Sequence, residues 1–189
     1  MSSPLRLAGM LTTDPTVVDA FAEQVQATGA TLHRCATVAD ARRAVAEILS
    51  SLAETAPPPP TVAATESATR LLPDDLAQTG ADQHAHYLDL GVSTAVLGVA
   101  ETGSMLLAPS SRWDRLLGIL ARTHVVAVAE RDVRASLDDL PAALHHDAAP
   151  YLSLVTGPSR TADIERVITI GAHGPRALHV LLVTEWAHA

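Results

Sequence analysis

The sequence predicts an α/β protein whose sheet is covered on both faces. Short runs of Val, Leu and Ile, such as 125–129 and 178–183, alternate along the chain with segments of helical periodicity. Strands that are apolar along their whole length are typical of sheets buried on both faces by helices. Hydrophobic residues make up 48% of the composition and aromatic residues only 3%, so we expect an aliphatic core.

Helix and strand signals alternate through the first 65 residues. Asp14, followed by a proline at the first helical position, begins a helix that Gly29 ends. Thr37 begins a second helix, which must end at the prolines 57–60 because proline lacks the N–H donor. The strands predicted beside these helices are 31–35 and 61–65.

The second half of the chain is richer in strands. Residues 82–88 suggest a short helix and 91–94 a loop. Two β-like runs, 94–99 and 104–108, flank a glycine-containing turn and predict a hairpin or a bent pair of strands. Ser111 and Ser136 begin helices. The remaining predicted strands are 125–129, 152–155, 167–170 and 178–183.

Composition excludes several classes of protein. The 189 residues predict one domain, 1–189, and its longest uncharged apolar stretch, 92–100, is too short to span a membrane. The start of the chain does not resemble a signal peptide, and a single cysteine, Cys35, fits a reducing cytoplasm. A net charge of −8 argues against binding nucleic acid. Cys35 has no evident activating neighbour beyond His33 and Arg34, so we expect a buried, inert thiol.

The loop that follows the apolar run 151–155 has the highest density of polar groups. From Gly157 onward it presents two hydroxyls, a guanidinium and two carboxylates: Ser159, Arg160, Thr161, Asp163 and Glu165. In open α/β folds ligands bind just outside the carboxyl ends of strands, and hydroxyls with a guanidinium can hold an anion. The same residue types also cap helices, so the start of a helix is the alternative interpretation.

Glu101 and His173 are the candidate catalytic residues. Glu101 lies in a turn between apolar strands, where partial desolvation would raise its pKa and suit a general base or an acyl-attacking nucleophile. Alternatively it accepts backbone N–H bonds and stiffens the turn. His173, between glycines, is either exposed by a tight loop or is a turn residue bonded to the backbone. A metal site from His173, Asp163 and Glu165 is chemically possible, but no spacing demands it, and none is predicted.

Three motifs together resemble the LUD-domain family, specifically its lactate-utilisation protein C group. They are Ala100-Glu-Thr-Gly-Ser104, the loop 157–165, and Gly171-Ala-His-Gly-Pro-Arg-Ala-Leu-His-Val180, and the resemblance is strongest over 91–183. The resemblance implies a three-layer α/β/α sandwich with a mostly parallel sheet, related to sugar-phosphate isomerases and CoA transferases. The ligand-binding residues expected in these motifs are Thr102, Gly103, Ser104, Gly157, Ser159, Arg160, Thr161, Asp163, Glu165 and Gly174.

Two functions follow from these observations. The resemblance implies an accessory protein or subunit in the oxidation of L-lactate to pyruvate, with iron–sulfur clusters on partner proteins and a small carboxylate or phosphate as ligand. No cofactor is expected on this chain itself, because it has neither a dinucleotide fingerprint nor enough cysteines for a cluster. The alternative is a free-standing enzyme of the isomerase or CoA-transferase type that uses Glu101 as base or nucleophile.

Overall fold

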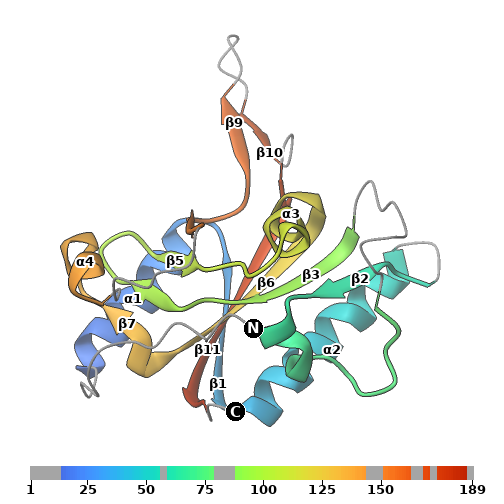
Figure 1. Cartoon of the computed structure of the whole chain (residues 1–189), viewed down its shortest axis with the longest axis horizontal. Coiled ribbons are helices and arrows are strands. Elements are labelled where there is room, and N and C mark those ends of the chain that lie inside the picture. Colours follow the sequence, from blue (N-terminus) through green and yellow to red (C-terminus); the bar gives the residue numbers. More distant parts are fainter. Residues whose placement is uncertain are drawn as a thin grey trace.

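A five-stranded parallel sheet is the centre of the molecule. The computed structural model describes residues 14–55, 59–78, 88–143, 151–162, 168–170 and 174–186. The strand order is β1-β11-β6-β3-β2, and every pairing in this sheet is parallel, as the sequence predicts. The strands are β1 (Thr31–Thr37), β2 (Val62–Ala64), β3 (Leu88–Thr94), β6 (Ala121–Ala129) and β11 (Ala177–Glu185). Figure 1 shows the sheet crossing the middle of the molecule.

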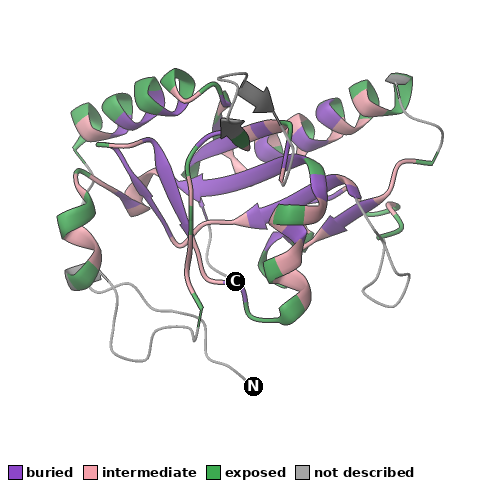
Figure 2. Cartoon of the chain, turned by 90° about the horizontal axis from the view of Figure 1, so that it is seen from above, coloured by how far each residue is buried: buried purple, intermediate pink, exposed green. Residues whose placement is uncertain are grey.

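One face of the sheet is covered by the helix α2 (Val38–Thr55) and the 3-10 helix η1 (Glu66–Leu71). Thr37 and Asp40 cap α2 reciprocally: the Asp40 carboxylate accepts from the Thr37 N–H at 3.0 Å, and the Thr37 hydroxyl accepts from the Asp40 N–H at 3.2 Å. The inner side of α2, including Val45, packs on strand residues such as Leu181. The strands are largely buried, while the helices carry exposed residues on their outer sides (Figure 2).

The opposite face is covered by the helix α1 (Pro15–Ala27) together with a second, smaller sheet. Phe21 of α1 and Met105 of the second sheet are both fully buried in this part of the core. The second sheet has the order β7-β4-β5-β8, and β4 and β5 form the antiparallel hairpin that the sequence predicts. Its strands are β4 (Leu97–Val99), β5 (Ser104–Leu107), β7 (Val133–Arg134) and β8 (Ser153–Val155).

The segment 91–94, predicted as a loop, is instead the second half of β3. Gly91 lets the helix α3 (Arg112–Leu120) lie directly on the strand, since a Cβ there would be 2.6 Å from a methyl carbon of Leu117. The polar Ser93 is bonded within the sheet, its hydroxyl 2.9 Å from His124 Nε2. The predicted helix 82–88 lies outside the described residues, except that Leu88 begins β3.

Two predicted strands are not part of the parallel sheet. Residues 152–155 supply β8 to the second sheet, and 167–170 supply β10 (Ile168–Ile170), which pairs antiparallel with β9 (Arg160–Ala162). Figure 1 shows this hairpin projecting from the body of the protein. The connecting elements are η3 (Glu130–Asp132), η4 (Leu137–Asp139) and α4 (Leu140–Ala143). Within the part of the chain that the structure describes, no helix is long and apolar enough to cross a membrane.

Candidate functional site

The described parts of the three sequence motifs lie together, and we call residues 102–104, 156–160 and 174–175 the motif cluster. Hydroxyl groups join the first two motifs: the Ser104 Oγ lies 2.7 Å from the Thr102 Oγ1 and 2.5 Å from the Thr156 Oγ1. Ser104 is only 1% exposed, Thr102 is half-buried and Thr156 is exposed, so the chain of hydroxyls runs from the protein interior to the surface. Segments some fifty residues apart are thereby held in one place.

Two glycines let the motif cluster press against the end of α1. Gly103 has a φ of 65°, and a Cβ there would lie 2.7 Å from backbone atoms of Gln24 and Val25. Gly157 has a φ of 68°, and its Cβ would lie 2.9 Å from the carbonyl oxygen of Thr28. Both turns therefore need glycine for their backbone conformation and for space.

The third motif joins the cluster through Ser159. The backbone N–H of Ser159 donates to the carbonyl oxygen of Pro175 at 2.9 Å. A Cβ on Gly174 would lie 3.0 Å from the Ser159 Cβ, so the two segments are in close contact. His173 lies outside the described residues, so its catalytic role stays a prediction.

The motif cluster lies at the amino-terminal edge of the parallel sheet. Thr28, to which Arg160 of the cluster is bonded, lies shortly before the start of β1, and the Gly174–Pro175 segment lies shortly before β11. The loop does follow the carboxyl end of a strand, but that strand, β8, belongs to the second sheet. The rule that places ligands at the carboxyl ends of parallel strands does not apply to this loop.

Arg160 ties the loop to the end of α1. Its Nη2 donates to the carbonyl oxygen of Thr28 at 2.6 Å, and the side chain remains exposed. Residues 160–162 form β9 and not a helix, so the helix-start interpretation is wrong for this part of the loop. The side chain of Thr161 is not described, and Asp163 and Glu165 lie outside the described residues. Anion binding by this loop stays a prediction.

Glu101 is exposed and ionised, which corrects the expectation of a raised pKa. Its Oε2 accepts from the Leu137 N–H at 3.1 Å and from the Ser136 hydroxyl at 2.9 Å. These bonds, the one from Leu137 first, lower the pKa of Glu101 below its usual value. The carboxylate thus stiffens the turn by accepting a backbone N–H, as in the alternative interpretation.

An open cavity of about 390 Å³ adjoins Glu101. Residues of α1, Glu23 among them, form one side, and Ala100, Glu101 and Ala135 form the other. The cavity places a second carboxylate opposite Glu101, so it is not suited to an anion.

Two histidines in strands of the parallel sheet have lowered pKa values. Burial lowers the pKa of the fully buried His124 to about 4. His179 shares a 3.0 Å hydrogen bond with His33, and burial, followed by the charge of His33, lowers the pKa of His179 to about 4.

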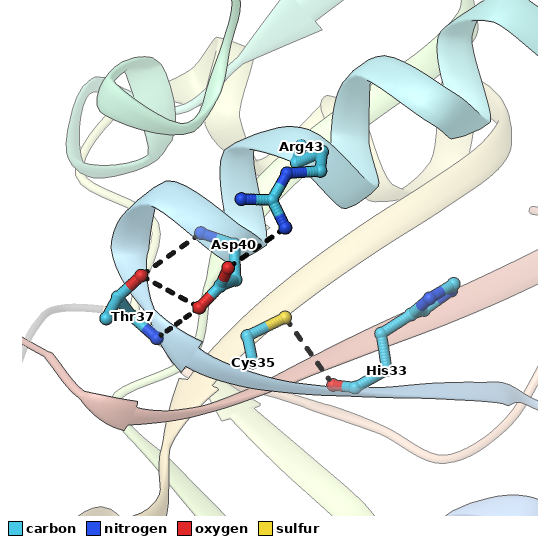
Figure 3. Close-up of polar contacts among 5 residues, drawn as sticks. All are labelled: His33, Cys35, Thr37, Asp40 and Arg43. Atoms are coloured by element: carbon cyan, nitrogen blue, oxygen red, sulfur yellow. Dashed lines mark hydrogen bonds and ion pairs between the residues drawn. The ribbon is translucent and has the colours of Figure 1, made fainter.

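Cys35 is buried, and its burial raises the pKa of the thiol, as expected for an inert cysteine. Figure 3 shows its sulfur directed at the carbonyl oxygen of His33, 3.8 Å away, beside the Thr37–Asp40 cap. Among the described residues, no three His, Cys, Asp or Glu side chains come together as metal ligands.

A second group of polar residues, not found from the sequence, lies at the opposite edge of the parallel sheet. Thr65 and Ser67 follow β2, Thr94 ends β3, and Arg131 follows β6. The sequence does indicate such a group, because each of these residues stands at or just after the end of a strand. If 91–94 is taken as a loop, Thr94 is not expected at the end of a strand beside β2, and its position next to Thr65 cannot be predicted.

A family model and several known proteins are similar to this chain. A model of the LUD domain matches residues 18–183. Lactate utilization protein C of Geobacillus sp. (strain WCH70) is 25% identical over 108 residues, which are 54% of this chain and 45% of that protein. The protein of the same name from Bacillus subtilis (strain 168) is 24% identical over 107 residues, 53% of this chain and 45% of that protein. The chain thus spans less than half the length of these two relatives.

A solved structure supports the same assignment at the level of fold. The crystal structure of a DUF162 family protein from Deinococcus radiodurans aligns with a TM-score of 0.64 at 17% sequence identity. The alignment covers 92% of this chain and 99% of that chain. At this identity the likeness concerns the fold alone, an α/β fold that agrees with the parallel sheet described above. Because the family model spans most of the sequence, the chain belongs to the LUD-domain family.

Proposed function

We propose that this chain acts in the utilisation of L-lactate as a member of a lactate-oxidising system. In this proposal the chain itself carries no redox group. The family match over 18–183, together with the name lactate utilization protein C borne by its relatives, carries this proposal. The chain spans only part of the length of those relatives, so their activity is a proposal for this chain.

The chemistry of lactate oxidation requires partners. Oxidation to pyruvate removes two electrons and two protons, and the electrons need an acceptor. An iron–sulfur cluster usually takes four thiolates, whereas this sequence has one cysteine, which is buried with a raised pKa. Iron–sulfur clusters on partner proteins would supply the acceptor, and this chain would bind a small anion or dock those partners.

The motif cluster would be the rigid part of such a site. Its chain of hydroxyls, centred on the buried Ser104, and its two glycine turns fix the backbone of the loop that begins at Gly157. Arg160 uses one nitrogen on Thr28, and a guanidinium has five N–H donors, so donors remain for a carboxylate or phosphate. Arg160→Ala should therefore weaken anion binding about tenfold or more if this loop holds the ligand.

Co-purification tests the proposal in cells grown on lactate. A tagged chain should bring down cysteine-rich iron–sulfur proteins from lactate-grown cells and not from glucose-grown cells. The purified chain should be colourless and should not oxidise lactate with an artificial acceptor until those partners are added. Turnover of lactate by the isolated chain, or tightly bound flavin, would contradict the proposal.

The alternative, an isomerase- or CoA-transferase-type enzyme, is less favoured by the geometry of Glu101. A lowered pKa makes a carboxylate a weaker base, and the two hydrogen bonds to Oε2 also draw electron density from the carboxylate and make it a weaker nucleophile. Loss of a measurable isomerase or CoA-transfer activity in Glu101→Gln would favour this alternative.

A further inference from the structure

Two histidines on neighbouring strands of the parallel sheet meet at their ring nitrogens. His33 stands on β1, the edge strand of the sheet, and His179 stands on β11, which pairs with β1. The Nε2 of His33 lies 3.0 Å from the Nδ1 of His179, although the residues are 146 positions apart in the chain. The ring planes differ by 28° and the ring centres are 5.3 Å apart. That separation equals the N···N distance plus the radius of each ring, so the rings meet edge to edge, nitrogen to nitrogen.

Both rings lie on the face of the sheet that α2 covers. Cys35 and Leu181 belong to the core cluster on that face, and each histidine stands two residues before one of them. Since side chains alternate along a strand, His33 and His179 share this face. Figure 3 shows the His33 ring and the Cys35 sulfur on the side of β1 that carries α2. Both histidines are half-buried, so solvent reaches the pair while neighbouring side chains restrict it.

The electrostatic surroundings of the pair suit a cation. Burial lowers the pKa of His33, and the negative charge of Glu47 on α2 opposes this effect, so the carboxylate lies within electrostatic reach of the ring. Burial, followed by the charge of His33, lowers the pKa of His179 to about 4. Both rings are therefore neutral at pH 7, and the neutral imidazole is the form that binds a metal ion.

The spacing of the two nitrogens is close to that of a metal chelate. A tetrahedral metal ion bound about 2.0–2.1 Å from each of two imidazole nitrogens holds these nitrogens about 3.3 Å apart. The two nitrogens here are 3.0 Å apart, so they have to separate only slightly. Because they face each other, each ring also has to turn by about 35° toward a common point. The terminal torsion of a histidine side chain is broad, so this turn is accessible.

We infer that His33 and His179 together bind a divalent transition-metal ion such as Zn²⁺, through Nε2 of His33 and Nδ1 of His179. Imidazole is a preferred ligand of Zn²⁺, whereas Mg²⁺ takes oxygen ligands. No third His, Cys, Asp or Glu among the described residues joins the pair, so water completes the coordination. The bound ion ties the edge strand β1 to β11. This site does not depend on the proposed role in lactate use.

Titration of the full chain with ZnCl₂, followed by calorimetry and by NMR of the histidine rings, tests the inference. The ring signals of His33 and His179 should shift on addition of Zn²⁺, and binding should saturate with a dissociation constant of about 10–100 µM. His33→Gln and His179→Gln should each weaken this binding at least about tenfold. MgCl₂ should neither shift the ring signals nor compete with Zn²⁺.

A matched control separates this pair from other histidines of the chain. His145 and His146 are adjacent in the sequence and lie outside the described residues. The double variant His145→Gln/His146→Gln should still show the Zn²⁺-dependent shifts of the His33 and His179 rings. A hundredfold excess of Zn²⁺ over its dissociation constant should raise the midpoint of thermal unfolding by about 5–10 °C in the wild type and in this control, but not in His33→Gln.

Two results would overturn the inference. One is the absence of saturation below about 1 mM Zn²⁺, which would leave only the hydrogen bond between the two rings. The other is binding of wild-type affinity in both His33→Gln and His179→Gln that is lost in the double variant, which would place the ion at residues 145–146. The ring signals are recorded on the wild-type chain, so the test stays valid even if a variant does not fold.

Discussion

Alanine at Gly103 should destabilise the protein more than alanine at Gly29, although both glycines have a positive φ. The φ angles are 65° at Gly103 and 87° at Gly29. An L-residue in this region costs about 1–2 kcal/mol, and that cost is common to both substitutions. The difference between the two variants therefore reports the local space, not the backbone angle.

The new Cβ meets different atoms at the two sites. At Gly103 it would lie 2.7 Å from backbone atoms of Gln24 and Val25, which are fixed in α1. Moving packed backbone costs about a further 1–3 kcal/mol, so Gly103→Ala should lose about 2–5 kcal/mol in total. At Gly29 it would lie 2.5 Å from the Arg160 Nη2, the end of an exposed side chain that can swing away with the loss of one exposed hydrogen bond to Thr28. Gly29→Ala should lose about 1–2 kcal/mol.

Equilibrium unfolding in urea, followed by circular dichroism, measures both losses. The midpoint should fall further for Gly103→Ala while the slope of the transition stays the same. Gly29→Ala in an Arg160→Ala background controls for the displaced guanidinium. Equal losses for the two single variants, within about 0.5 kcal/mol, would mean that the turn does not press against α1 as described.

Three other predictions concern stability and local structure. His124 alone should lower the unfolding free energy by up to about 3 kcal/mol from pH 6.5 to pH 4, because its pKa is lowered to about 4 and it stays neutral in the folded chain while the unfolded chain binds its proton. Unfolding at a series of pH values should show a smaller slope for His124→Gln. Ser104→Ala should cost about 1 kcal/mol in urea unfolding, because it removes the two hydrogen bonds of a buried hydroxyl, while the exposed Ser110→Ala should change stability by less than about 0.5 kcal/mol. Glu101→Gln should speed deuterium exchange at the Leu137 amide, and unchanged exchange there would mean that the carboxylate does not hold this N–H.

Local signals predicted the helices at the amino-terminal end of the chain well. The Asp14 carboxylate accepts from the Thr16 N–H at 2.9 Å, and α1 begins at Pro15 as expected. These capping contacts act within three or four residues, so the local sequence is enough to predict where the helix begins. The strand 91–94 was missed because its stability comes from α3 and from His124, which are distant in the sequence.

The candidate site was predictable only in part, because several of its contacts join residues that are distant in the sequence. The sequence motifs identified Ser104 and the loop at Gly157 as ligand-binding candidates, and the structure places them in one cluster. The environment of Glu101 depends on Ser136 and Leu137, which no local pattern links to it. The pairing of Ser67 with Thr94 likewise required the order of strands in the sheet.

The proposed role in lactate use is tested most directly by growth after deletion of the gene in its source organism. The account predicts slower growth on L-lactate as sole carbon source, unchanged growth on glucose, and recovery when the wild-type chain is restored. Equal growth of the deletion strain and its parent on L-lactate would contradict the account.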